Sequence, residues 1–380
     1  MTAIPSTERA RVARRKENRT RPTRPDGPDT DRPMTENDPR ADDSRTDSGD
    51  PDAIYNALRA EIGRVLIGND DAVELLTIAL LTRGHLLLEG VPGVAKTTLA
   101  NLFARASGLE YNRVQMTPDI LPADITGTEI YRESGEAFEL QRGPVFANVV
   151  VADEINRATP KTQSALLEAM QERHVTIGGE TLALPRPFMV IATQNPIEME
   201  GVFELPEAQR DRFQFKHRID LPDEDAELNL VDRFDGEPML GPTAVEQVVD
   251  REEILTARER ADDVHVARPV KRYLVDLVGA TRSHPDVAHG ASPRATLASL
   301  NGVKARAAIR GREYVIPDDV KALAEPILAH RLVLTTDAGL SDVAAADVIA
   351  DVIESVDVPG TEVAIEQEAT SGGDGASPAE

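Results

Sequence analysis

Short apolar runs alternate with segments of helical periodicity in the first part of the chain. Apolar residues recur at helical spacing over 53–66, and a second helix is expected over about 70–83. The runs at 85–89 (HLLLE), 149–152 (VVVA) and 188–192 (FMVIA) are typical of strands buried on both faces of a parallel sheet. Helices that alternate with such strands predict an α/β domain whose sheet is mainly parallel.

The hydrophobic pattern changes near residue 222. Strand patterns fade from about residue 225 onward and helical periodicity dominates, so we expect an α/β domain over 51–222 and a helical domain over 223–355. Residues 1–50 are rich in Arg, Pro and Asp and hold almost no apolar side chains, which predicts a disordered tail. Residues 356–380 are polar and predict a flexible tail.

Composition excludes several classes of protein. The chain has 380 residues, of which 41% are hydrophobic, so it can form a substantial core. It has no Cys, which excludes disulfides, thiolate zinc sites and Cys nucleophiles. No apolar run approaches the ~20 residues that a membrane-spanning helix needs, and no apolar segment follows the basic start to make a secretory signal. We therefore expect a cytoplasmic protein without a membrane span.

The chain is strongly acidic, with 66 Asp and Glu against 42 Lys and Arg and a net charge of −24. Only 7 of the basic residues are Lys, and an acidic, Lys-poor surface is typical of halophilic, salt-adapted cytoplasmic proteins. This charge weighs against nucleic acid as a partner, because non-specific binding depends on Lys and Arg at phosphates. Residues 1–33 carry the opposite balance, with nine basic and five acidic side chains. These residues form either a genuine basic tail or a segment assigned to the chain in error, with Met34 as the true first residue.

The strongest motif follows the first predicted strand, where residues 90–97 read GVPGVAKT and a helical segment comes next. Glycines let backbone N–H groups turn toward phosphate oxygens, and the helix N-terminus adds a partial positive charge. This is the pattern of a Walker A loop, in which Lys96 reaches the β- and γ-phosphates and the Thr97 hydroxyl binds Mg²⁺. Ala95 replaces the usual glycine before Lys96, which is tolerated if its φ is negative. The alternative is an ordinary glycine-rich turn with a surface lysine. The residues expected to bind nucleotide are Gly90, Val91, Pro92, Gly93, Val94, Ala95, Lys96, Thr97 and Thr98.

Polar residues follow the other two predicted strands. Asp153 and Glu154 end the second strand, and ligands bind at the carboxyl edge of parallel sheets. Asp153 is expected to hold Mg²⁺ through water, and Glu154 to orient and deprotonate the attacking water as a general base. The alternative is an acidic pair without a function. Asn195 follows the third strand and either positions the water or forms a turn before Pro196.

These motifs, in this order, resemble those of the AAA+ ATPases. The strings GVPGVAKT (90–97), DEINRA (153–158), ATQNP (192–196) and LPEAQRDRF (205–213) resemble the MoxR family, and the resemblance covers about 51–355. It implies a P-loop NTPase with an α/β/α core, a smaller C-terminal helical lid, and ATP and Mg²⁺ as cofactors. Ala95 is the residue that this family itself commonly carries.

The resemblance also assigns residues outside the two main motifs. Arg212 matches the arginine finger, which reaches the γ-phosphate of a neighbouring subunit; Arg210 competes for this role, and the alternative is a surface salt bridge. Arg294 matches the sensor-2 arginine at the start of a lid helix, where Ser292 and Pro293 suit the N-cap and first positions. The alternative there is a solvated arginine. Ile67 and Gly68 match the segment near the adenine.

The resemblance implies a ring-shaped homo-oligomer, most simply a hexamer, that remodels client proteins and pairs with von Willebrand factor A domain proteins. Residues 119–146 match an insertion that faces the central pore of the ring. Residues 175–182 read as a β-hairpin that matches a second such insertion. The alternative is that both segments are plain surface loops. Two other functions stay open, a nucleic-acid motor and a nucleotide switch that does not hydrolyse ATP. The sequence does not identify the client.

Overall fold

Five parallel strands form the main sheet of the described part of the chain. Their order is β2-β5-β8-β1-β9. These strands are β1 (Leu86–Glu89), β2 (Tyr111–Gln115), β5 (Val149–Asp153), β8 (Met189–Gln194) and β9 (Phe215–Arg218). The protein is represented by a computed structural model, which describes residues 49–132, 137–196, 201–237 and 241–360. Most of the two expected tails, residues 1–48 and 361–380, lies outside the described residues.

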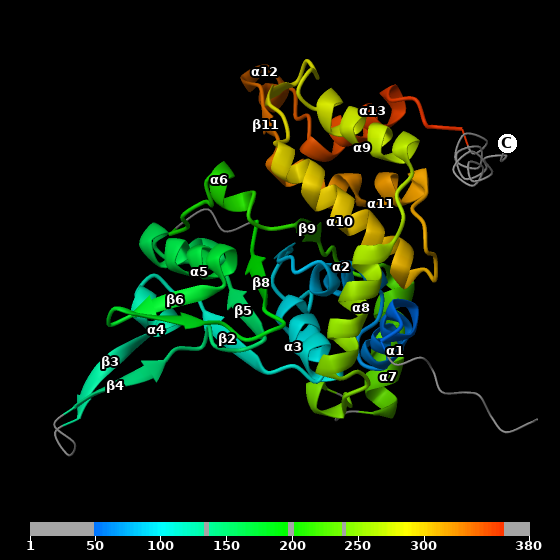
Figure 1. Cartoon of the computed structure of the whole chain (residues 1–380). Coiled ribbons are helices and arrows are strands. Elements are labelled where there is room, and N and C mark those ends of the chain that lie inside the picture. Colours follow the sequence, from blue (N-terminus) through cyan, green and yellow to red (C-terminus); the bar gives the residue numbers. More distant parts are fainter. Residues whose placement is uncertain (1–48, 133–136, 197–200, 238–240, 361–380) are drawn as a thin grey trace, which may run out of the picture. The chain divides into compact units, whose positions relative to one another are not determined.

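Helices cover both faces of this sheet (Figure 1). The helices of the first half of the chain are α1 (Pro51–Gly63), α2 (Asp70–Leu81), α3 (Lys96–Ala106), α4 (Pro122–Thr126) and α5 (Pro160–Glu172). Successive side chains of a strand point to opposite faces. Leu86 and Leu88 therefore join a hydrophobic cluster with α1, α2 and α3, whereas Leu87 joins a second cluster with α4 and α5. This layering confirms the predicted α/β class with a parallel sheet.

Two antiparallel hairpins interrupt the alternation of helix and strand. They consist of β3 (Gly127–Arg132) with β4 (Ala137–Arg142), and of β6 (His174–Ile177) with β7 (Glu180–Ala183). The second hairpin turns at Gly178 and Gly179, both with positive φ, as the sequence predicts. The first hairpin extends from the sheet in Figure 1 and exposes Tyr131 and Phe138, whose rings lie 5.3 Å apart. A side chain on Gly178 would collide with the Glu129 carboxylate of β3, so the two hairpins are in contact.

Helices dominate the described chain after β9, as the sequence predicts. They are α7 (Glu224–Gly236), α8 (Arg251–Asp263), α9 (Arg268–Ala280), α10 (Pro293–Ile309), α11 (Pro317–Leu328), α12 (Thr336–Leu340) and α13 (Ala345–Ser355). Shorter elements are α6 (Glu207–Arg210), η1 (Ile155–Arg157), η2 (Pro242–Ala244) and η3 (Ala329–Arg331), and an antiparallel pair of β10 (Val287–His289) and β11 (Val333–Leu334). The sequence pattern missed that pair. Among the described residues, none of the helices is both long and apolar enough to cross a membrane.

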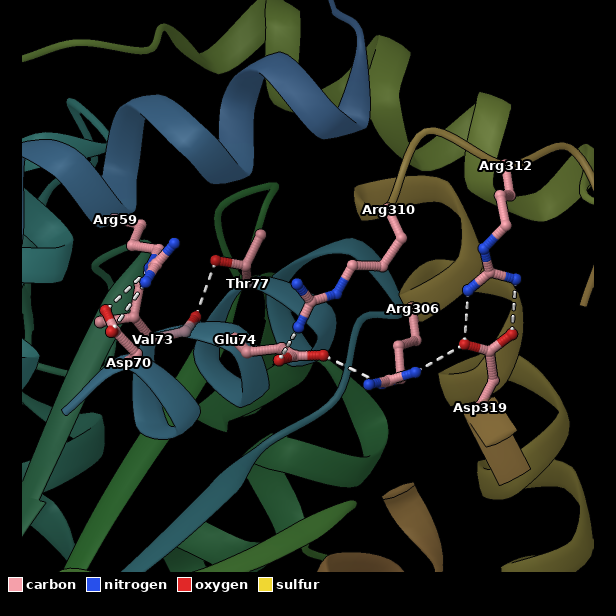
Figure 2. Close-up of polar contacts among 9 residues, drawn as sticks. All are labelled: Arg59, Asp70, Val73, Glu74, Thr77, Arg306, Arg310, Arg312 and Asp319. Carbon is pink, nitrogen blue, oxygen red and sulfur yellow. Dashed lines mark hydrogen bonds and ion pairs between the residues drawn. The ribbon is translucent and has the colours of Figure 1, made fainter. Parts of the chain in front are cut away.

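Buried ion pairs join α2 to α10 and α11 (Figure 2). Arg306 of α10 lies between Glu74 of α2 and Asp319 of α11, at 3.0 Å and 2.7 Å. Arg310 also pairs with Glu74, and Arg312 donates two hydrogen bonds to Asp319. Asp319 is fully buried and accepts the Ile316 N–H at the start of α11 as well. Such a carboxylate needs several donors, because a buried charge without partners is strongly destabilising.

Candidate functional site

The carboxyl ends of three neighbouring strands bring the predicted motifs together. Ala152 of β5 pairs with Ala192 of β8, and Gln194 of β8 pairs with Glu89 of β1. The phosphate loop follows β1, the acidic pair ends β5, and Asn195 follows β8. The three motifs therefore lie at one edge of the sheet, where open parallel sheets bind their ligands.

The segment between β1 and α3 has the geometry of a phosphate cradle. A Cβ atom on Gly90 would lie 2.5 Å from the Ile219 carbonyl oxygen, so only glycine fits where the chain leaves β1. Val94 anchors the loop in the hydrophobic cluster. Lys96 folds back over the loop and donates to the carbonyl oxygens of Gly90 and Val91 at 2.5 and 2.8 Å. Its ammonium group therefore lies inside the loop, beside the N-terminus of α3, which favours anions.

The sequence predicts that Ala95 fits the loop if its φ is negative, and the structure differs. Its φ is +61°, in the left-handed region, and the condition of a negative φ is therefore wrong. The turn into α3 imposes this conformation, because Ala95 is the N-cap residue of the helix. A left-handed conformation costs a residue with a Cβ atom about 1–2 kcal/mol, so this site carries strain that a glycine would avoid.

Thr97 and Asp153 form an oxygen site suited to Mg²⁺. The Thr97 hydroxyl donates to Asp153 Oδ1 at 3.0 Å, which joins the loop to the end of β5. Mg²⁺ prefers hard oxygen ligands and is usually held by one or two carboxylates, nucleotide phosphates and water. Burial would raise the pKa of Asp153, but hydrogen bonds from Thr193, Arg113 and Thr97 outweigh it and lower that pKa below its ordinary value. Asp153 is therefore an anion at neutral pH.

Arg113 of β2 is the cationic partner of Asp153 and was not found by sequence reasoning. Its Nε and Nη2 atoms donate to Asp153 Oδ2 at 3.1 and 2.5 Å. The register places Gln115 of β2 opposite Asp153, so that Arg113 lies two residues earlier on the same side of the strand. Gln115 in turn donates to Glu154 Oε2 at 2.9 Å.

Glu154 lies just beyond the strand, in a left-handed conformation with a φ of +58°. Its N–H donates to the Thr193 hydroxyl at 2.9 Å, and its carboxylate accepts from Gln115 and from Arg157 at 3.1 Å. The Glu154 and Asp153 carboxylates thus accept hydrogen bonds from different side chains, Gln115 and Arg157 in one case and Thr97, Thr193 and Arg113 in the other.

Asn195 lies at the same edge with 6% of its surface exposed. The preceding Gln194 donates to Glu89 Oε1 at 2.6 Å, and Lys216 of β9 pairs with the other oxygen of Glu89 at 2.8 Å. These contacts fix the end of β8 against β1. The role of Asn195 toward a water molecule stays a prediction. Ile67 and Gly68 lie in the turn between α1 and α2, and their role also stays a prediction.

Arg212 and Arg294 lie at the opposite edge of the sheet. They share a cavity of about 250 Å³ with residues 82–85, which precede β1. Asp211 and Gln214, which precede β9, also line it. A strand of four residues spans about 13 Å, so this cavity is separated from the phosphate loop by the length of β1. Both arginines therefore lie near the start of β1, whereas the phosphate loop follows its end.

Arg331 of η3 fixes the segment that carries Arg212. Its side chain is buried, and it donates to Asp211 Oδ1 at 2.7 Å and to the Phe213 carbonyl oxygen at 2.7 Å. Arg294 lies 3.7 Å from the other oxygen of Asp211. The Nε atoms of Arg210 and Arg212 are buried without a hydrogen-bond partner in the described part of the chain. Of the two candidates for the arginine finger, Arg212 lines the cavity, together with Arg83, Arg173, Arg294 and Arg331.

Comparisons with known families match both parts of the chain. A family model described as "ATPase family associated with various cellular activities (AAA)" matches residues 85–215. A second model, "AAA lid domain", matches residues 279–352.

Relatives cover most of the chain. "Chaperone MoxR1" of Mycobacterium tuberculosis is 46% identical over 79% of this chain and 81% of its own length. "Protein MoxR" of Methylorubrum extorquens is 34% identical over 78% of this chain and 91% of its own. A crystal structure of a candidate ATPase from Cytophaga hutchinsonii superposes with a TM-score of 0.75 at 38% identity, and covers 81% of this chain and 96% of the other.

Proposed function

Because the chain belongs to the MoxR family of AAA+ ATPases, we propose that it is a Mg²⁺-dependent ATP hydrolase that works in a ring and remodels partner proteins. The observation that carries the proposal is the hydrogen bond of 3.0 Å between Thr97 and Asp153, with Glu154 next to it. It joins a phosphate cradle, a metal position and a base at one edge of the sheet. We assign residues 51–222 to the nucleotide-binding core and 223–355 to the lid.

Each group at this edge has a role in hydrolysis. The loop N–H groups and Lys96 bind the phosphates, and Thr97 with Asp153 would hold the metal ion. Mg²⁺, when bound, neutralises charge on the β- and γ-phosphates. Glu154 orients the attacking water and accepts its proton, which is general-base catalysis. Asn195, at the end of the neighbouring strand, fixes the position of that water.

The place of Arg212 supports the proposed ring. An arginine that stabilises charge on the γ-phosphate must approach it within hydrogen-bond distance. Arg212 and Arg294 lie a strand length away from their own phosphate loop, so they serve the nucleotide of a neighbour. A head-to-tail interface forms a ring where its rotation closes, and we propose that it closes as a hexamer.

The partner is a protein. The relative from M. tuberculosis is named a chaperone, and we propose the same kind of work in the cytoplasm for this chain. The β3–β4 hairpin exposes Tyr131 and Phe138 for contact with an unfolding client. A von Willebrand factor A domain protein is the expected stable partner. The net charge of −24 disfavours the nucleic-acid motor, and the Glu154 carboxylate beside the metal position disfavours a switch that does not hydrolyse ATP.

The test separates binding from chemistry. Glu154→Gln keeps the shape of the side chain and removes the base, so we expect ATP to bind with unchanged affinity while turnover falls about 10²–10⁴-fold. Lys96→Ala should weaken binding itself. The matched control is Glu252→Gln on the exposed first turn of α8, which should leave both unchanged. Loss of ATP binding in Glu154→Gln would show that its assigned role is wrong, and full turnover would remove the hydrolase mechanism.

A further inference from the structure

Both carboxylate oxygens of Asp153 are occupied by donors from the chain itself. Oδ1 accepts from Thr97 at 3.0 Å and from Thr193 at 2.6 Å. Oδ2 accepts two N–H groups of Arg113, at 3.1 and 2.5 Å. An ionised carboxylate offers about four lone-pair positions, so these four bonds fill it. A hydrated metal ion can bind Asp153 only where one of these donors leaves.

Arg113 is the donor that can leave. Thr193 is fully buried in β8 and also accepts the N–H of Glu154, and Thr97 belongs to the phosphate loop and the metal position itself. The Arg113 side chain is 49% exposed at the edge of the sheet, so it can turn into solvent at little cost. A metal ion beside Asp153 also repels the guanidinium charge, which favours its departure.

Arg113 also connects Asp153 to the base. Its Nη2 donates to Gln115 Oε1 at 2.7 Å, and the Gln115 amide nitrogen donates to Glu154 Oε2 at 2.9 Å. The side chain of Gln115 thus uses its oxygen toward Arg113 and its nitrogen toward Glu154. Gln115, held by Glu154, therefore steadies Arg113 beside Asp153.

We propose, on the basis of the proposed function, that Arg113 and Mg²⁺ compete for Asp153. The exchange replaces one cation by another, so the buried carboxylate keeps a positive partner in both states. Arg113 holds Asp153 before the metal ion binds and turns into solvent when it arrives, and Gln115 favours the bound position of Arg113. Arg113 and Gln115 are positioning residues, because they act through Asp153.

The competition is tested by binding rather than by turnover. Mg²⁺ is titrated into the full chain with a fluorescent ATP analogue that cannot be hydrolysed, and the Mg²⁺ concentration at half-maximal binding is measured. Arg113→Met keeps the length of the side chain and removes the charge, and we expect this concentration to fall about three- to tenfold. Arg105→Met removes an exposed arginine from the last turn of α3 and should leave it unchanged. An unchanged or higher Mg²⁺ requirement in Arg113→Met would overturn the proposal.

A double-mutant cycle tests the connection to Gln115. Gln115→Ala removes the acceptor that steadies Arg113, so it should lower the Mg²⁺ requirement by about twofold. In the Arg113→Met background the same change should have no further effect, because the arginine it acts through is gone. A full effect of Gln115→Ala in that background would overturn the action of Gln115 through Arg113.

The outcomes also distinguish this inference from the proposed function. A wild-type chain that binds the analogue, with an unchanged Mg²⁺ requirement in Arg113→Met, leaves the proposed function standing and removes only the role of Arg113. A wild-type chain that binds no analogue at any Mg²⁺ concentration removes both.

Discussion

The left-handed backbone conformation of Ala95 places strain on a single residue of the phosphate loop. The turn from the loop into α3 requires a φ of +61°. Ala95→Gly should therefore raise the free energy of unfolding by about 0.5–1 kcal/mol, because relief of the steric strain exceeds the entropy that glycine adds to the unfolded chain. Urea denaturation of the two chains measures the difference.

In the matched control, the free energy of unfolding should change in the opposite direction. Ala60 lies exposed in the interior of α1, where its backbone is helical. Ala60→Gly should lower the free energy of unfolding by about 1 kcal/mol, because glycine is a poor helix former. A loss of stability in both variants would contradict the assignment of strain to Ala95.

Residues of the site could be predicted where a local motif defines them. Lys96, Thr97, Asp153 and Glu154 each stand in a short string with its own strand or helix, and the structure brings them to one edge. Arg113 could not be found in this way. It enters the site because β2 pairs with β5 in a register that sets Gln115 against Asp153, and register between distant segments leaves no local signal.

At the scale of elements, Asp319 joins the first turn of α11 to α10 and, through Arg306, to α2 (Figure 2). Asp319→Ala would leave Arg306 and Arg312 without this carboxylate, although their side chains are only 18% and 22% exposed. It would also remove the acceptor of the Ile316 N–H. We expect the free energy of unfolding to fall by about 2–4 kcal/mol, with some screening by solvent. Urea denaturation measures this loss.

Asp318 provides the control within the same helix. It is the exposed neighbour of Asp319 in the first turn of α11. Asp318→Ala makes the same change of charge but should cost only about 0.3–1 kcal/mol, the usual contribution of an acid near a helix N-terminus. Equal losses in the two variants would show that the helix dipole, and not the network, explains the effect.

The hydrophobic pattern predicted the central strands of the sheet and missed the edge strands. The predicted strands β1, β5 and β8 occupy the centre of the sheet, where both faces are covered, and their residues form continuous apolar runs. The strands β2 and β9 lie at the two edges and are largely polar and half exposed. Edge strands gain their hydrogen bonds from a neighbour rather than from an apolar run, so the pattern of hydrophobic residues missed them.

At the scale of the whole molecule, one hydrophobic cluster contains a face of the sheet, α1, α2, α3 and most of the C-terminal helices of the described chain. The interior of the lid is therefore continuous with that of the core. Arg331 extends this connection to the segment of Arg212 through Asp211. A movement of the C-terminal helices on ATP binding would reach Arg212 directly and, in the proposed ring, a neighbouring subunit.

Mixing two inactive variants tests whether Arg212 acts between subunits. Arg212→Ala should keep its own phosphate loop and base but offer no finger, whereas Glu154→Gln should keep its finger but lack the base. In a mixed ring, an Arg212→Ala subunit can receive the finger of a Glu154→Gln neighbour, so that interface is complete. Random mixing in equal amounts makes about one quarter of the interfaces complete, because each interface is head-to-tail. We expect this share of wild-type ATP turnover from two preparations that are each nearly inactive.

An arginine that acted within its own chain would give a different result. Every subunit of the mixture would then lack either the finger or the base, and the mixture would stay as inactive as its components. Combining both changes in one chain and mixing it with Arg212→Ala is the control, because no neighbour then supplies a finger. Arg294→Ala shares the cavity of Arg212 and should behave in the same way when mixed with Glu154→Gln. Recovery with Arg212→Ala alone would separate the two arginines and assign contact with the neighbouring nucleotide to Arg212.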